Sequence, residues 1–239
     1  MIRLVTFDLD DTLWDVAPVI VQAERALQEW LEQRAPALAE RYSMMDLKQL
    51  MADLVAAEPA LAHQISHLRI LALEQALQHS GHDRAEAVEL ARAGFAVFLQ
   101  ARHRVRYFEH VRETLERLSR HYIIGAITNG NADIRRLTLA PYFDFALAAE
   151  QLQASKPAPD LFLAALERAG TDPSAAVHVG DHVEHDIQGA QAVGMHTVWV
   201  NHERRPWPGG LPPSATIHRL DQLPQVVAQL APGQGLPTR

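Results

Sequence analysis

Hydrophobic residues along the chain fall into short runs, and longer segments with helical spacing separate these runs. Four nearly continuous apolar runs predict strands buried on both faces: residues 2–8, 122–128, 175–180 and 196–200. Two shorter strand candidates lie near residues 143–147 and 216–220. The intervening patterns predict helices at about 108–120, 131–139, 159–170, 185–193 and 221–230. Alternating strands and helices indicate an α/β fold with a doubly wound parallel sheet.

Residues 16 to about 104 contain no convincing strand and are dominated by Ala, Leu, Glu, Gln and Arg. Apolar residues such as Leu68, Leu71 and Ala72 recur at helical spacing, and we expect four or so helices. The predicted domains are therefore a core of residues 1–15 and 105–239, and a helical insert of residues 16–104. We expect the insert to sit over the carboxyl edge of the sheet, where open α/β sheets bind ligands. The tail, residues 231–239, is expected to fray.

Composition narrows the class of protein. The 239 residues are 48% hydrophobic, and no apolar run approaches the ~18 residues of a membrane span. The first strand candidate begins at Ile2, so we expect no signal peptide and a cytoplasmic location. The chain has no cysteine, which excludes disulfides and thiolate chemistry. A net charge of −7 argues against nucleic acid as a partner. We expect a monomer or homodimer that contacts no membrane.

Carboxylates crowd the end of the first predicted strand, in the segment "VTFDLDDTLWD". Side chains alternate along a strand, so Asp8 and Asp10 are expected to point the same way. Two carboxylates on one side of a strand end must be solvated, protonated or bound to a cation. The alternative is an acidic loop followed by a helix cap, which is the role we expect for Asp11 and Asp15.

Two further segments indicate an anion site at the same edge of the sheet. In "AITNGN", Thr128 and Asn129 offer a hydroxyl and an amide, and Gly130 allows a ligand to approach the backbone. The helix expected next would add free N–H groups. In "SKPAPD", a proline follows Lys156 and favours an extended conformation for this lysine. A fixed ammonium group is a point charge suited to phosphate.

A third acidic strand end, "VGDHVEHD", supplies Asp181 and Asp186. Together with the first strand end, it predicts a site of oxygen ligands for a hard cation. Mg²⁺ is suited to a few carboxylates together with substrate phosphate oxygens.

The order DxDxT, then T-N after a strand, then K-P, then GDxxxxD resembles the haloacid dehalogenase superfamily of aspartate-nucleophile hydrolases. The match spans essentially the whole chain. It implies a Rossmann-like core with an inserted helical cap of that superfamily's first type. It also implies that Asp8 is the nucleophile and that Asp10 is the general acid and base, whose backbone carbonyl reaches Mg²⁺. The other implied roles are loop support for Thr12, phosphate binding for Thr128, Asn129, Gly130 and Lys156, and metal binding for Asp8, Asp181 and Asp186.

The resemblance implies an Mg²⁺-dependent phosphatase that hydrolyses a small-molecule phosphate monoester through an aspartyl-phosphate. The segments "FDLDDTLWDVAPVI" and "SKPAPDLF" resemble the subfamily of phosphatases that act in riboflavin biosynthesis. The implied substrate is 5-amino-6-(5-phospho-D-ribitylamino)uracil or flavin mononucleotide (FMN).

Three other functions remain open at this stage. A 2-haloacid dehalogenase uses the same nucleophile but has no aspartate at the position of Asp10, because a halide leaves without a proton. A phosphomutase keeps both aspartates and returns the phosphoryl group to its substrate. A non-catalytic phosphosugar-binding module would not need Asp8 and Asp10 together with Lys156.

Other polar or aromatic residues have two interpretations each. Trp14 either lines the substrate site or packs at the hinge before the insert. Arg69 and His67 lie within an apolar helical pattern and either face the substrate or are solvated. His182 and His185 are candidates for a transition-metal site, or simply lie on the loop and first helical turn after Asp181.

Overall fold

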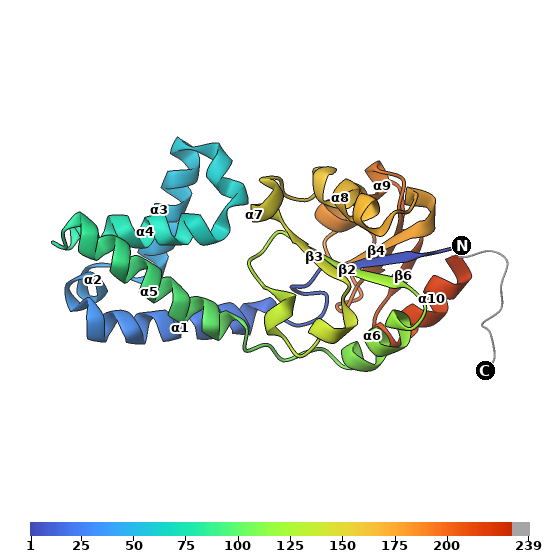
Figure 1. Cartoon of the computed structure of the whole chain (residues 1–239), viewed down its shortest axis with the longest axis horizontal. Helices are drawn as coiled ribbons and strands as arrows, with labels where there is room; N and C mark the ends of the chain where they lie inside the picture. Colours follow the sequence, from blue (N-terminus) through green and yellow to red (C-terminus); the bar gives the residue numbers. More distant parts are fainter. Residues whose placement is uncertain (231–239) are drawn as a thin grey trace. The chain divides into compact units, whose positions relative to one another are not determined.

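A computed structural model of the chain describes residues 1–230, and the frayed tail expected at 231–239 lies outside them. The chain divides into two compact units (Figure 1). One unit, here called the sheet unit, comprises Met1–Asp15 and the described part of Arg106–Arg239. The other, here called the helical unit, comprises Val16–Val105.

Within residues 1–230, six strands form one sheet in the order β3-β2-β1-β4-β5-β6, and every neighbouring pair is parallel. This confirms the predicted fold class. The central strand β1 pairs with β2 on one side and β4 on the other, so Leu4 lies opposite Ile123 and Ala176. The strands are β1 (Leu4–Phe7), β2 (Ile123–Thr128), β3 (Phe145–Ala148), β4 (Ala176–Gly180), β5 (His196–Val200) and β6 (Ala215–Ile217).

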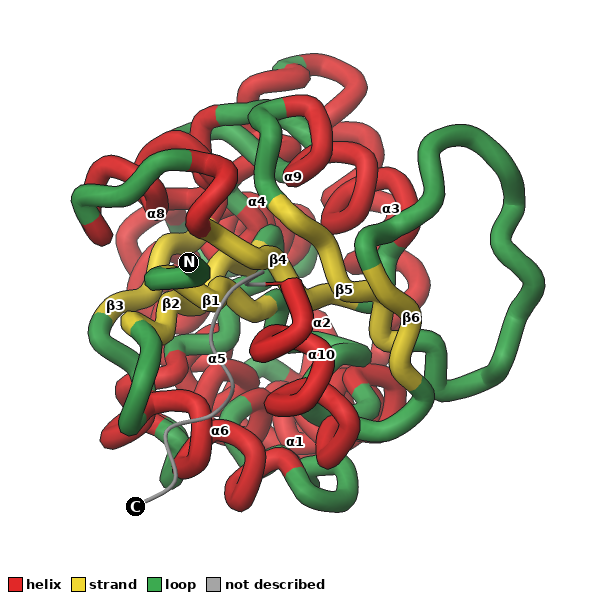
Figure 2. The backbone as a smooth tube through the Cα atoms, turned by 90° about the vertical axis from the view of Figure 1, so that its right-hand side faces the viewer, coloured by secondary structure: helices red, strands yellow, loops and turns green. Residues whose placement is uncertain are grey.

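Helices cover both faces of the sheet, as continuously apolar strands require. Figure 2 shows α8 (Asp160–Ala169) and α9 (Gly189–Ala192) on one face, and α6 (Val111–Ser119) and α10 (Leu223–Leu230) on the other. The short α7 (Ala149–Leu152) follows β3. Apolar side chains of α8 pack on the strands and form one buried cluster that includes Leu4, Ile127, Leu161, Phe162 and Ala165.

Two predicted helices differ from the structure. The helix expected at 131–139 is wrong, because only Ile134–Arg136 forms a single 3₁₀ turn there. The carboxylate of Asp133 caps this turn by accepting from the backbone N–H of Arg135, but the backbone is extended again at Leu137, where the turn ends. The helix expected at 185–193 is instead a π-helix, Val183–Gln188, which continues into α9.

The helical unit consists of five α-helices, all within the described part of the chain, and a short 3₁₀ helix at Pro59–His63. Apolar side chains from all five helices form a common buried core. Helices α1 and α5 approach closely at Gly94, where an added Cβ would lie 3.1 Å from Leu27 and Trp30. The helices are α1 (Val16–Arg34), α2 (Pro36–Arg41), α3 (Met44–Ala57), α4 (Ile65–His79) and α5 (Arg84–Arg102).

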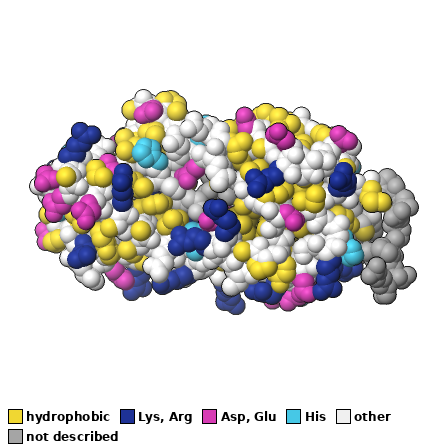
Figure 3. Space-filling model, in the orientation of Figure 1, with side chains coloured by type: hydrophobic (Ala, Val, Ile, Leu, Met, Phe, Trp, Pro, Cys, Tyr) yellow, Lys and Arg dark blue, Asp and Glu magenta, His cyan; other side chains and the backbone are white. Residues whose placement is uncertain are grey.

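Charges of both signs lie on the surface. On the face shown in Figure 3, Lys and Arg side chains are interspersed with Asp and Glu and do not gather in one basic patch. Among residues 1–230, no helix combines the length and the apolar character that crossing a bilayer requires.

Candidate active site

The carboxyl ends of β1, β2 and β4 meet at one edge of the sheet because these three strands are parallel neighbours. A pocket of about 170 Å³ lies there, within the sheet unit. The residues that line it come from the predicted motifs: Asp8, Asp10, Asp11, Thr128, Asn129, Gly130, Lys156, Asp181, His182, His185 and Asp186. The structure therefore brings all four motifs together.

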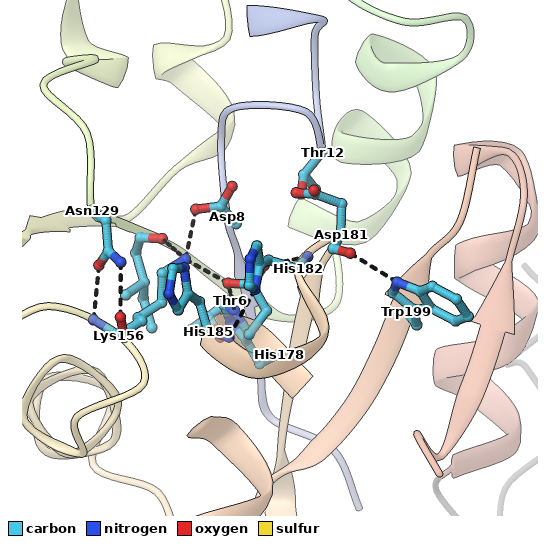
Figure 4. A network of polar contacts seen from close by, with 12 residues as sticks. Thr6, Asp8, Thr12, Asn129, Lys156, His178, Asp181, His182, His185 and Trp199 are labelled. Atoms are coloured by element: carbon cyan, nitrogen blue, oxygen red, sulfur yellow. Dashed lines mark hydrogen bonds and ion pairs between the residues drawn. The ribbon is translucent and has the colours of Figure 1, made fainter. Parts of the chain in front are cut away.

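Lys156 is the central cation of this pocket, and it is 3% exposed. Its ammonium nitrogen donates to Asp8 Oδ1 at 2.6 Å, to Asp186 Oδ1 at 2.6 Å and to the carbonyl of Ile127 at 3.0 Å (Figure 4). These three acceptors match the three donors of an ammonium group. Burial lowers the pKa of Lys156, but the two carboxylates outweigh burial and raise it overall. The side chain therefore stays charged.

Asp186 is held on both of its carboxylate oxygens. Besides Lys156, Oδ1 accepts from His178 Nε2 at 3.1 Å, and Oδ2 accepts from the backbone N–H of His182 at 3.0 Å. Burial acts to raise the pKa of Asp186, but the charge of Lys156 and the bond from His178 lower it overall. Gly180 makes this packing possible, because an added Cβ would lie 2.3 Å from the carboxylate carbon of Asp186.

His178 lies in β4 and is completely buried. Its Nδ1 lies 2.9 Å from the hydroxyl of Thr6 on the neighbouring strand β1. Burial lowers the pKa of His178 and keeps the ring neutral. Since an ionised carboxylate only accepts, Nε2 carries the proton and donates to Asp186, while Nδ1 accepts from Thr6. Sequence reasoning missed this pair, although a histidine inside the apolar run "AVHVG" was a visible signal.

Asp181 is anchored by two elements of the sheet unit. Its Oδ1 accepts from the hydroxyl of Thr12 at 2.9 Å, and its backbone carbonyl accepts from the indole N–H of Trp199 on β5 at 2.8 Å. Thr12 is buried and does not line the pocket, consistent with loop support. Burial, and next the negative charge of Asp186, raise the pKa of Asp181 to about 7.

The acidic cluster suits a divalent cation. Asp8, Asp181 and Asp186 each place a carboxylate oxygen within 4.8 Å of the others. Burial is the largest cause that raises the pKa of Asp8, with further contributions from Asp186 and Asp181. Three carboxylates against one ammonium group leave two negative charges uncompensated when all are ionised. Oxygen ligands and a twofold charge deficit fit a hard divalent metal ion.

All three residues of the Thr-Asn-Gly segment after β2 line the pocket, and Asn129 also binds the backbone of Lys156. The side-chain amide of Asn129 clamps the backbone of Lys156, accepting from its N–H at 2.8 Å and donating to its carbonyl at 2.9 Å (Figure 4). Asn129 therefore positions the lysine. Thr128 is 3% exposed, and its hydroxyl accepts from the backbone N–H of Gly130 at 3.0 Å. The 3₁₀ turn that follows does not supply the helix N-terminus that we expected.

Five other predicted or considered residues are placed as follows. Asp10 lines the pocket, and its Oδ1 accepts from the indole N–H of Trp14 at 2.9 Å. Trp14 is fully buried in the sheet unit and is not among the pocket's lining residues. Arg69 lies in the helical unit, with its guanidinium carbon 4.0 Å from the ring centroid of Phe98. The rings of His182 and His185 stack with centroids 3.9 Å apart at the pocket wall.

Comparison with known proteins identifies the family. The family model described as haloacid dehalogenase-like hydrolase matches residues 2–194. A curated relative, 5-amino-6-(5-phospho-D-ribitylamino)uracil phosphatase YigB of Escherichia coli, is 34% identical over 95% of this chain and 96% of its own. The ribulose-1,5-bisphosphate 5-phosphatase of Halopiger xanaduensis is 32% identical, with 83% and 84% coverage.

A solved structure described as a 2-haloacid dehalogenase from Pseudomonas syringae pv. tomato is also similar. It is 51% identical, covers 97% of this chain and 100% of its own, and has a TM-score of 0.94. The family model and the two curated relatives cover most of the chain, and the solved structure has the same fold over nearly all of it. As its motifs predict, the chain is an enzyme of the haloacid dehalogenase-like hydrolase family.

Proposed function

We propose that this hydrolase is an Mg²⁺-dependent phosphatase that cleaves a small-molecule phosphate monoester through an aspartyl-phosphate on Asp8. The observation that carries the proposal is the 2.6 Å contact between Asp8 Oδ1 and the buried ammonium of Lys156, in a pocket that Asp10 also lines. A carboxylate nucleophile, a fixed cation and a second carboxylate are the groups that phosphoryl transfer to an enzyme needs.

The chain's own residues account for both half-reactions. A carboxylate oxygen of Asp8 attacks phosphorus, the bond to the leaving oxygen breaks, and a proton from Asp10 passes to that oxygen, releasing the alcohol. Water then attacks the aspartyl-phosphate, Asp10 takes up a proton from the water, and the bond to Asp8 breaks. The products are an alcohol and inorganic phosphate. Lys156 remains protonated throughout and offsets charge on the phosphoryl oxygens.

Asp8 and Asp181, with Asp186 next to them, are the side chains that would hold Mg²⁺. When bound, the ion supplies the positive charge that lowers repulsion between a carboxylate and a phosphate. The hydrogen bonds that Asp186 already makes to Lys156, His178 and His182 favour a supporting position for it. The resemblance to the superfamily implies that the backbone carbonyl of Asp10 would be a further ligand of the ion.

For the substrate, we propose 5-amino-6-(5-phospho-D-ribitylamino)uracil or FMN. Support comes from the motif strings and from the full-length similarity to the E. coli phosphatase that is named for the first of these compounds. Since no residue of the helical unit lines the pocket, the pocket itself offers contacts for a phosphate group but none that select a leaving group.

A second candidate, 2-haloacid dehalogenase, is favoured by the description of the 51% identical structure. Asp10 argues against it. Displacement of a halide by Asp8 gives a leaving group that needs no proton, so an acid at this place would have no use in that step. The cluster of Asp8, Asp181 and Asp186 likewise suits a cation that halide displacement does not require.

The test measures phosphate release and halide release side by side. Purified enzyme is assayed with p-nitrophenyl phosphate, FMN and the ribitylaminouracil phosphate, and with 2-chloropropionate, each with Mg²⁺ and with EDTA. We expect phosphate release that EDTA abolishes and no chloride release. Asp8→Asn should remove the activity without unfolding the protein. Chloride release that survives EDTA, without phosphatase activity, would refute the proposal in favour of the dehalogenase.

A further inference from the structure

The indole of Trp14 makes a specific contact with the carboxylate that the proposed mechanism uses as acid and base. Trp14 is 0% exposed, and its Nε1–H donates to Asp10 Oδ1 at 2.9 Å. An indole nitrogen is a donor only, and a buried one needs an acceptor. In this structure the acceptor is the carboxylate of Asp10, which lines the pocket.

The backbone holds Trp14 in place for this contact. The chain after β1 turns back on itself, with Asp11 in a left-handed conformation at φ 57°. The carbonyl of Trp14 then accepts from the N–H of Asp11 at 2.8 Å. On the other side, Trp14 forms a β-bridge with Tyr107, and the two rings pack at a centroid distance of 6.2 Å. The backbone of Trp14 and its ring are therefore both held by contacts within the sheet unit.

The position of Trp14 indicates that it supports Asp10 and does not contact the substrate itself. Asp10 lines the pocket, whereas Trp14 does not. An effect of the indole N–H on the reaction must therefore pass through the carboxylate it holds. Anchoring one oxygen restricts rotation of the Asp10 side chain, and proton transfer depends on a well-oriented acid within hydrogen-bond reach of the leaving oxygen.

We propose that Trp14 is a positioning residue, whose indole N–H orients the carboxylate of Asp10 for proton transfer to the leaving group. This inference rests on the proposed phosphatase function and deepens it. It assigns Trp14 a role different from both interpretations that the sequence allowed, a wall of the substrate site and a packing residue at the hinge.

The experiment compares two substrates in a double-mutant cycle. Trp14→Phe keeps an aromatic ring and removes the N–H. Hydrolysis of an alkyl phosphate such as glycerol phosphate needs a proton on the leaving oxygen, whereas p-nitrophenolate leaves almost without one. At saturating substrate, we expect the first-turnover rate of alcohol release from the alkyl phosphate to fall about tenfold, and that of p-nitrophenolate release to change less than about twofold, because only the first half-reaction depends on the leaving group. In the Asp10→Asn background, Trp14→Phe should cause no further loss for the alkyl phosphate.

Two further variants separate orientation from folding. Tyr107→Phe keeps the ring that packs on Trp14 and removes only a hydroxyl that bonds to Thr138, so it should match wild type on both substrates. Trp14→benzothienylalanine replaces the N–H by sulfur in a ring of the same shape, and it serves if Trp14→Phe does not fold.

The outcomes are distinct for the two proposals. An equal loss of the first-turnover rate on both substrates, or a full additional loss in the Asp10→Asn background, would overturn the role of Trp14 while wild-type phosphatase activity stands. Absence of phosphate release from wild type with Mg²⁺ would instead overturn the proposed function, and the inference with it.

Discussion

The ammonium nitrogen of Lys156 lies 2.6 Å from a carboxylate oxygen of Asp186, and the two side chains are 2% and 1% exposed. Removing either partner should destabilise the folded protein, because the remaining charge would be buried without compensation. The same ammonium group also contacts Asp8, so a structural ion pair and the proposed nucleophile share one cation.

Lys156→Met should therefore destabilise the protein as well as inactivate it. The change leaves Asp8 and Asp186 buried next to each other without their cation, and we expect the free energy of unfolding to fall by about 3 kcal/mol or more. Chemical denaturation in EDTA at neutral pH measures this difference. Arg120→Met, which breaks an exposed pair with Glu116, is the matched control and should cost less than about 1 kcal/mol. Equal losses would contradict the prediction.

The raised pKa of Asp181 predicts how metal binding depends on pH. The pKa is about 7 in the folded state, against an ordinary value of 3.8. Between these values the folded state binds more protons than the unfolded state, so this group's contribution to stability is present at low pH and is lost as pH rises through 7. Asp8, whose pKa is also raised, acts with the same sign. The lowered pKa of Asp186 matters only below 3.8.

Mg²⁺ requires ionised carboxylates, so its stabilising effect should grow over the same interval. We expect the rise in Tm caused by saturating Mg²⁺ to be larger at about pH 8 than at about pH 5.5. Asp181→Asn should reduce this rise and weaken its dependence on pH, and the part that is due to Asp8 should remain. Thermal unfolding with Mg²⁺ and with EDTA at each pH provides the measurement. A pH-dependent rise that Asp181→Asn leaves intact would show that other groups cause it.

The buried contact between His178 and Asp186 predicts that substitutions of His178 and of its partner Thr6 reduce kcat by different amounts. His178→Phe keeps the ring but removes the bond to Asp186, and should lower kcat about tenfold because Lys156 loses part of its support. Thr6→Val keeps the shape of Thr6 but leaves Nδ1 of His178 unpaired. It should lower the free energy of unfolding by about 1 kcal/mol with a smaller effect on kcat. The hypothesis fails if Thr6→Val reduces kcat more than His178→Phe does.

Arg69 has a measurable structural role within the helical unit. Its guanidinium lies over the ring of Phe98, which is completely buried. Arg69→Ala should therefore lower the free energy of unfolding by about 1 kcal/mol or more, through loss of the cation–π contact and of packing by its aliphatic stem. Arg25→Ala, which removes an exposed ion pair with Glu29 in the same unit, should have almost no effect. An unchanged unfolding midpoint for Arg69→Ala would contradict this.

Much of the sheet unit could be predicted from the sequence because its signals are local. Apolar runs of strand length identified β1, β2, β4 and β5, and alternation of strands with helices implied their parallel pairing. Parallel strands end at the same edge, so linear order alone was enough to place Asp8, Thr128 and Asp181 around one pocket. The helix expected at 131–139 is wrong because the 3₁₀ turn that Asp133 caps ends at Leu137, whose extended backbone the apolar periodicity did not predict.

Only the tertiary structure decided which hydrogen-bond partner each side chain of the site has. Asn129 binds the backbone of Lys156, 27 residues away, and Thr6 binds His178, 172 residues away. The pair of Thr6 and His178 depends on the register that places these two residues opposite each other on β1 and β4. Trp14 is the clearest case. Its place in the sequence allowed a role at the substrate site or at the hinge, whereas the turn at Asp11 directs its indole to Asp10. Sequence determines which chemical groups reach the edge of the sheet, and the pairing of their hydrogen bonds requires distances of about 3 Å that only the folded chain sets.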